Sequence, residues 1–219
     1  MKKTSEKTGV EHELVCGLPD DQQVCEILLR LPDPYQVMAW LVVETGLRLN
    51  DVAGLPVRAF SLARRTMTVT DAAIVRRFVL SEGLAAALAD HLAALRPRYE
   101  GQGSRTFRLF RMPRTEEPVR FADSLLFPAW SVRGYERTSG NLVIPVPWIV
   151  DALDRAAGET GFIGVIHSNT LRHACVTRWI NQGLPVAEIH HRLGHRDLMT
   201  TLLLVQALQH GGLTFTTAA

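Results

Sequence analysis

The chain has 219 residues, 47% of which are hydrophobic, and a formal net charge of only +2 at pH 7. This length and hydrophobic content suit one globular domain with a buried core, while so small a charge does not by itself indicate a nucleic-acid partner. No apolar run approaches the roughly 18 residues that cross a bilayer, and no apolar signal-peptide segment follows the charged start of the chain. The three cysteines are widely spaced, which favours a reducing cytoplasmic setting over a disulfide framework.

The spacing of apolar residues predicts a mostly helical fold with one small sheet. Apolar side chains recur every three or four residues in most segments, as in amphipathic helices. Two short runs instead indicate the strands of an antiparallel hairpin, with a turn at Asp71-Ala72-Ala73. Ser81 is placed to cap the helix that follows. In chain order we expect helices at about 19–31, 35–46 and 50–55, strands at 66–70 and 76–80, and helices at 82–95, 147–157, 170–182, 185–193 and 197–208.

The remaining segments indicate one domain with short tails. Residues 1–13 are polar and are expected to be disordered, and 211–219 are expected to form a C-terminal tail. The region 96–145 is rich in Gly, Pro, Ser and Arg and is predicted to be irregular. Because no domain boundary is evident between the tails, residues 14–210 are expected to fold as a single domain.

Arginine supplies almost all of the positive charge. Lysine occurs only at Lys2, Lys3 and Lys7, so 21 of the 24 basic residues are arginine. A guanidinium group binds phosphate through a bidentate fork that lysine cannot copy. A GC-rich coding bias would produce the same composition, so both interpretations stay open.

Three short motifs, far apart in the chain, carry the functional signal. The first is Thr45–Leu55 (TGLRLNDVAGL), the second is Asn169–His173 (NTLRH) and the third is Leu193–His195 (LGH). In their order and spacing they resemble motifs of the tyrosine recombinase (phage integrase family) catalytic domain. The resemblance spans roughly residues 18–208. It implies an α+β, mostly helical fold with a small antiparallel β-hairpin, and DNA as the partner.

The resemblance assigns phosphate binding to four residues. Arg48 and Arg172 match the family's two arginines, which neutralise charge on the phosphate under attack. His195 matches the histidine of the L-G-H motif. Asn169 stands where the family has a histidine, and it offers a hydrogen-bond donor without a proton shuttle. Simpler roles stay open: Arg172 could form a buried ion pair with Asp51, and His195 could cap a helix.

The groups that cleave DNA in the family are missing at the matching positions. The nucleophilic tyrosine falls at Leu204, and no tyrosine follows Tyr135. The hairpin lysine, which protonates the leaving 5′-oxygen, falls near Ala72. Its absence does not depend on the alignment, because no lysine occurs beyond Lys7. An arginine nearby would not replace this acid, because a guanidinium hardly releases its proton.

Further basic residues are candidates for DNA contacts. The arginines between residues 96 and 120 either hold the DNA backbone or belong to a solvated connection. His191 and His195 have the i, i+4 spacing of some zinc sites, but no cysteine pair accompanies them. No metal and no other cofactor is therefore expected. The candidate additional DNA contacts are Arg58, Arg64, Arg65, Arg76, Arg77 and His173.

Together these observations predict a cytoplasmic protein, encoded by a bacterium or a mobile element, that binds double-stranded DNA and is associated with DNA recombination or integration. We expect it to be unable to cleave DNA by itself and to have an accessory, regulatory or plasmid-maintenance role. Its partner would be a second copy or an active recombinase, and no membrane is expected. One alternative is an active site-specific recombinase or relaxase-like enzyme that uses a non-standard nucleophile or a partner's tyrosine. The other is a protein-interaction module without DNA binding.

Overall fold

A computed structural model describes residues 18–71, 74–101, 121–132, 142–164 and 166–209. The tails expected at 1–13 and 211–219, and Ala72 and Ala73 of the hairpin turn, lie outside these residues. Within the described part of the chain, no helix is both long enough and apolar enough to cross a membrane.

The structure is mostly helical and contains a small antiparallel sheet, as the sequence predicts. The helices other than α4 begin and end within about two residues of their expected positions, which is the usual uncertainty of a helix end. The elements are α1 (Asp21–Arg30), α2 (Tyr35–Thr45), α3 (Leu49–Ala53), β1 (Phe60–Ser61), β2 (Thr66–Asp71), β3 (Ile74–Val79), α4 (Glu82–Gly101), α5 (Val146–Glu159), α6 (Thr170–Asn181), α7 (Val186–Leu193) and α8 (Leu198–Gln209), with short 3-10 helices at Val57–Ala59, Leu62–Arg64, Phe121–Asp123 and Ala129–Ser131.

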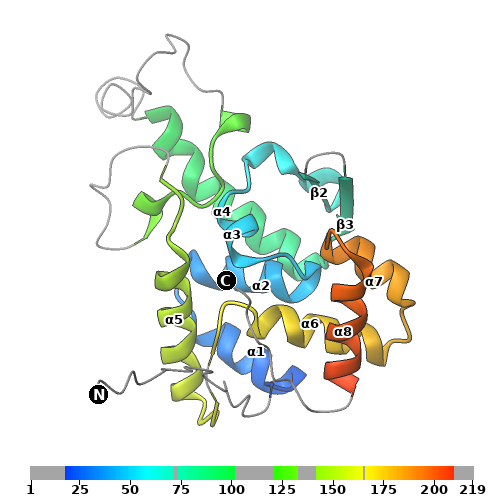
Figure 1. The fold of residues 1–219 in the computed structure, drawn as a ribbon. Coiled ribbons are helices and arrows are strands. Elements are labelled where there is room, and N and C mark those ends of the chain that lie inside the picture. Colours follow the sequence, from blue (N-terminus) through cyan, green and yellow to red (C-terminus); the bar gives the residue numbers. More distant parts are fainter. Residues whose placement is uncertain (1–17, 72–73, 102–120, 133–141, 165, 210–219) are drawn as a thin grey trace, which may run out of the picture.

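Helix α2 is the centre of the fold. It is apolar on nearly all sides, and its Met38, Leu41 and Val42 side chains are completely buried. It packs against α1, α3, α4 and α6, and Figure 1 shows it in the middle of the molecule between α4 and α6. A helix that is hydrophobic all round has to be surrounded by other elements, so α2 organises the helices around it.

Helix α6 connects two hydrophobic clusters. Leu171 and Ala174 belong to the main core around α2. Cys175, Val176 and Trp179, one turn or more further along, belong to a second cluster that α7 and α8 complete. Figure 1 shows α7 and α8 together on one side of the molecule, next to the end of β3. The second motif of the sequence therefore begins a helix that joins the core to this C-terminal part.

The sheet consists of β1, β2 and β3 in that order, with antiparallel pairing throughout. In β3, Arg76 and Phe78 are buried, whereas Val75, Arg77 and Val79 are exposed. This alternation is the normal consequence of a pleated strand, whose successive side chains point to opposite faces. Strand β1 was not predicted, because two residues are too few to show a period in the sequence.

The prediction that the helix after the hairpin ends at Leu95 is wrong, because α4 runs to Gly101 and includes Pro97. Proline removes a backbone donor and crowds the preceding turn, which is why the sequence indicated a helix end there. The guanidinium group of Arg96 lies 5.0 Å from the centre of the Phe121 ring. This cation–π contact helps to hold the later part of α4 against the segment that begins at residue 121.

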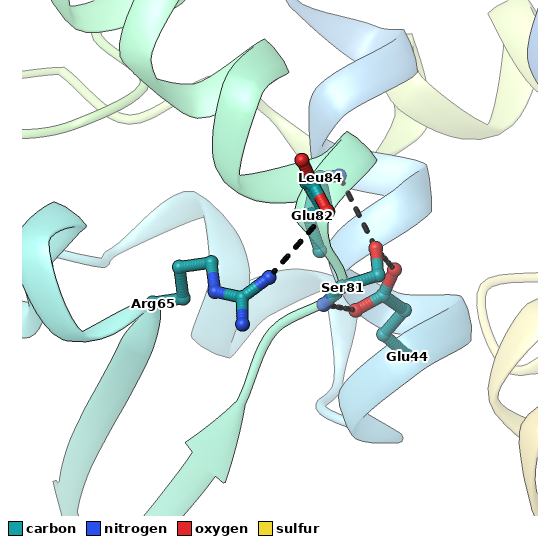
Figure 2. A network of polar contacts seen from close by, with 5 residues as sticks. All are labelled: Glu44, Arg65, Ser81, Glu82 and Leu84. Carbon is teal, nitrogen blue, oxygen red and sulfur yellow. Dashed lines mark hydrogen bonds and ion pairs between the residues drawn. The ribbon is translucent and has the colours of Figure 1, made fainter.

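Ser81 fixes the start of α4, as predicted (Figure 2). Its Oγ accepts a 3.2 Å hydrogen bond from the backbone N–H of Leu84. The carboxylate of Glu44, near the end of α2, accepts a hydrogen bond from the Ser81 hydroxyl and a 2.9 Å bond from its backbone N–H. Arg65 approaches Glu82, in the first turn of α4, with 3.8 Å between nitrogen and oxygen. The network ties α2 to the segment between β3 and α4.

Replacing Ser81 with alanine should lower the free energy of unfolding by about 1–2 kcal/mol, because α4 loses its cap and Glu44 loses a donor. Urea denaturation followed by circular dichroism measures the change. Ser81→Thr keeps the hydroxyl group and should stay within about 0.5 kcal/mol of the wild type. An equal loss in both variants would show that the hydroxyl group is not what stabilises this helix start.

Candidate functional site

The guanidinium group of Arg172 is buried where α6 meets the end of α7. The residue is 3% exposed. Its Nη2 donates a 3.1 Å hydrogen bond to the backbone oxygen of Leu193, the last residue of α7, and lies 2.9 Å from Nε2 of His195. Its Nη1 is buried and has no partner within the described residues. A buried charged donor without an acceptor is costly, so this nitrogen marks a place where an oxygen atom of a ligand would be stabilised.

Arg76 reaches the same end of α7 from β3. It is also 3% exposed. Its Nη1 donates to the backbone oxygens of Arg192, at 3.2 Å, and of Leu193, at 3.3 Å. Its Nε is buried and again has no partner in the described part of the chain. Two arginines from distant parts of the sequence therefore share one acceptor, the oxygen of Leu193, and each keeps one buried N–H unused.

Gly194 makes room for this arrangement. Its φ angle of +66° is left-handed, and it ends α7. A Cβ atom at this position would lie 2.8 Å from Cζ of Arg76, closer than real Cβ contacts come. Glycine is therefore required at residue 194 for two reasons, the backbone conformation and the guanidinium group packed over it.

Arg48 lies at the start of α3, directly after the left-handed turn that ends α2. Gly46 forms that turn with a φ angle of +64°, and a Cβ there would lie 2.7 Å from the Trp179 ring on α6. This close approach brings the start of α3 near α6. Arg48 itself is exposed, and its charge lowers the pKa of both Arg172 and Arg76. The three arginines therefore form one electrostatic cluster, which we call the arginine cluster.

A chain of hydrogen bonds behind the arginine cluster fixes His195. Arg172 can only donate, so Nε2 of His195 accepts and the imidazole proton lies on Nδ1. That Nδ1 is 2.9 Å from Oγ1 of Thr201, on α8, which is 2.9 Å from Nδ1 of His190, on α7. His195 donates to the Thr201 hydroxyl, and this hydroxyl in turn donates to His190. Arg172 is thus positioned by groups from α7, α8 and the turn between them, and His195 does not cap a helix.

Burial and the neighbouring arginines set the charges in the site. Burial, followed by the charge of Arg48, lowers the pKa of Arg172 to about 10, and Asp51 partly opposes this shift. Arg172 is still positively charged near pH 7. Burial, followed by the charge of Arg172, lowers the pKa of His195 to about 4, so this imidazole is neutral. No described carboxylate lies within 4 Å of the guanidinium nitrogens of the arginine cluster, and the alternative of a buried Arg172–Asp51 ion pair is therefore not realised.

Comparison with known proteins identifies the fold. The model of the phage integrase family matches residues 148–207. The XerA recombinase has a TM-score of 0.63 and 15% identity, over 96% of this chain and 65% of that one. The XerH site-specific recombinase, solved bound to its difH substrate before cleavage, has a TM-score of 0.59 and 16% identity, over 89% and 53%. The catalytic domain of bacteriophage HP1 integrase has a TM-score of 0.51 and 13% identity, over 87% of both chains.

The chain has the fold of tyrosine recombinase catalytic domains, and its residues 148–207 match the phage integrase family model. It spans 65% of the length of XerA and 53% of XerH, so it matches only part of those recombinases. No curated protein matches its sequence. The matched segment includes α6, α7 and most of α8, the three helices that surround Arg172.

Of the three positions that the sequence resemblance matches to missing recombinase groups, the two that the structure describes lie in different surroundings. Leu204, which the sequence resemblance matches to the nucleophile, is 5% exposed and belongs to the second hydrophobic cluster, together with Cys175 and Trp179. Asn169 is exposed just before α6, and its side chain makes no capping hydrogen bond. Ala72 lies outside the described residues. In the described part of this fold, Leu204 of α8 is therefore a core residue.

The structure brings together only some of the additional candidates for DNA contact. Arg76 belongs to the arginine cluster, and His173 lies beside Arg172, whose charge together with burial lowers its pKa to about 4. The others are exposed: Arg58 lines a groove beside Arg76 and forms an ion pair with Asp123, Arg65 approaches Glu82, and Arg64 and Arg77 point outward. Across the described ranges, no three His, Cys, Asp or Glu side chains are arranged to hold a metal ion.

The sequence did not predict any role for Thr201, and it placed Arg76 only among the additional candidates for DNA contact. The alternation of β3 contains the signal for Arg76, because residue 76 shares a face with the core residue Phe78. Nothing in the sequence indicates that the Thr201 hydroxyl joins His190 to His195, because this contact depends on how α7 and α8 pack.

Stability should fall as the pH is lowered from about 6.5 to about 4, and His195 should contribute to this fall. Its folded-state pKa of about 4 lies below the ordinary histidine value of about 6.5. Between these values the unfolded chain binds more protons than the folded protein, so lowering the pH favours unfolding. In His195→Gln the free energy of unfolding, measured in urea at each pH, should change less steeply with pH. The reason is that unfolding of the variant takes up fewer protons, by up to about one.

The variant keeps a side-chain oxygen that can accept from Arg172. Equal slopes for the variant and the wild type would show that His195 is not held neutral in the folded protein.

Proposed function

We propose that this protein binds double-stranded DNA by holding a backbone phosphate on the arginine cluster, with Arg48 and Arg172 as the main ligands and His195 and Asn169 beside them. The observation that carries the proposal is the buried Nη1 of Arg172, which has no acceptor within the described residues and lies in a cluster of like charges. An anion supplies the missing acceptor and offsets the repulsion.

The surroundings favour a phosphate over a carboxylate side chain of the protein itself. Arg48, Arg76 and Arg172 contribute three positive charges, whereas Asp51 and Asp71 lie near Arg76 without forming an ion pair with it. His195 is neutral and adds no repulsion. The exposed Arg48 would meet the ligand from the solvent side and the buried Arg172 from the protein side. A duplex backbone, with its regular phosphates, is the ligand that this family fold suits.

We further propose that the protein does not cleave DNA by itself. The side chain of Leu204 has no nucleophilic atom. Two nearby groups that could replace a tyrosine are unsuitable: Thr201 is 0% exposed, and burial raises the pKa of the Cys175 thiol to about 12. A guanidinium such as that of Arg76 cannot act as the acid for the leaving oxygen. An accessory, regulatory or plasmid-maintenance role in DNA recombination or integration follows from binding without cleavage.

The alternative that deserves a test is an enzyme that receives a tyrosine from a second protein. XerH was solved with its difH substrate, which supports DNA binding by this fold. In this chain α8 packs on α6 and α7 of the same molecule and fills the second cluster with Leu204 and Val205. A partner's helix would have to approach the phosphate without displacing α8.

Binding to duplex DNA should weaken about 10-fold or more in Arg48→Ala and in Arg172→Met, because each loses a charge-assisted hydrogen bond to phosphate. The slope of log K against log salt should become shallower by about 1 in each variant, since one fewer counterion is released. Fluorescence anisotropy with random-sequence duplexes at several salt concentrations measures both quantities. Arg155→Ala, on the exposed side of α5, removes the same charge far from the site and is the matched control.

The same duplexes, prepared with a nick that traps a covalent intermediate, separate binding from cleavage. We expect no covalent adduct on a denaturing gel. An adduct formed by the protein alone would refute the proposed loss of cleavage, and equal binding by all four proteins would refute the phosphate site.

A further inference from the structure

We propose that Arg76 is a third ligand of the same phosphate, contributed by β3, and that its Nε and the Nη1 of Arg172 hold that phosphate between them. This inference rests on the proposed function, because it assigns a further ligand to the same site. It concerns a residue of the second hairpin strand, whereas the lysine that the chain lacks would fall before that strand, near Ala72.

The first support is the unused donors. Within the described residues, three buried side-chain nitrogen or oxygen atoms lack a partner, and two of them are Nε of Arg76 and Nη1 of Arg172. Both side chains are 97% buried, and both are fixed by the same oxygen, that of Leu193. A phosphodiester has two nonbridging oxygens, so one phosphate can accept from both guanidinium groups at once.

The second support is how firmly Arg76 is positioned. Its Nη1 is fixed by two carbonyl oxygens at the end of α7, where the helix dipole is negative and favours a cation. The guanidinium group also lies directly against Gly194, where a Cβ would collide with its carbon. Holding one edge of the guanidinium in this way leaves Nε in a fixed orientation. A donor that is already oriented loses little entropy when it binds its ligand.

The third support is access. Arg76 lines a groove of about 600 Å³ between α3 and the sheet, together with Asn50, Thr68 and Thr70. The groove opens to solvent and leads an anion to the neighbourhood of Arg76, although Arg172 is not among the residues that line it. Asp51 and Asp71 also line it, and they raise the pKa of Arg76, which burial lowers. A guanidinium hardly releases its proton, so Arg76 is charged, as phosphate binding requires.

The chemistry distinguishes this role from that of the missing lysine. Arg76 keeps its proton and supplies charge and hydrogen bonds, but it does not protonate a leaving oxygen. Three arginines around one phosphate therefore increase affinity for the DNA backbone without restoring cleavage.

The test compares Arg76→Met, Arg76→Lys and the control Arg155→Ala by anisotropy with duplex DNA at several salt concentrations. Arg76→Met should bind about 10-fold or more weakly, with a slope of log K against log salt shallower by about 1. Arg76→Lys should recover the slope, because the charge returns, while the affinity stays below that of the wild type. Melting temperatures for each variant establish that the compared proteins are folded.

A purely structural role for Arg76 predicts a different result. A folded Arg76→Met protein with wild-type slope and affinity, beside a weakened Arg172→Met protein, would overturn the inference and leave the proposed function intact. Failure of the wild type itself to bind duplex DNA would overturn both.

A second measurement covers the case in which Arg76→Met does not fold. The Nε–H signal of Arg76 in the wild-type nitrogen–proton NMR spectrum, assigned by its loss in Arg76→Lys, should shift when a short duplex is added. An unchanged signal at saturating duplex would overturn the inference.

Discussion

The structure depends on a buried positive charge that the protein only partly neutralises. Arg172 enters the interior from α6 and finds two acceptors, the oxygen of Leu193 and the imidazole of His195, but no carboxylate within 4 Å. Removing a charge from water without pairing it is unfavourable by several kcal/mol, so such a group persists only where the fold holds it strongly or a ligand completes it. Here the fold holds the group, because Thr201 orients His195, and one donor of Arg172 stays unused.

This constraint explains the arrangement of the C-terminal helices. The end of α7 supplies the acceptor for Arg172 and Arg76, and Gly194 turns the chain away directly afterwards. Helix α8 then returns across α6 and α7, where Thr201 meets the two histidines and Leu204 enters the second hydrophobic cluster. Leu204 therefore stabilises the packing of α8 against α6 and α7. Helix α8 also holds His195, through Thr201, against Arg172.

Much of the fold could be predicted because local patterns determine it. The apolar periodicity located the helices other than α4, and Ser81 marked the beginning of α4 because a hydroxyl before a helix caps it. The end of α4 could not be predicted, because Pro97 indicates a helix end in the sequence but lies inside α4. In the site, the motifs identified Arg48, Arg172 and His195, but the bond from Arg172 to His195 depends on the tertiary fold. The position of Arg76 over Gly194 equally depends on β3 reaching the end of α7.

A crystal of the protein soaked with tungstate, a phosphate-shaped anion with a strong anomalous signal, tests the central claim most directly. The account predicts an anomalous peak whose oxygen atoms lie about 3 Å from Nη1 of Arg172, the usual length of such a hydrogen bond. It would be contradicted by a carboxylate or backbone oxygen of the protein bonded to that nitrogen, with tungstate bound elsewhere or absent.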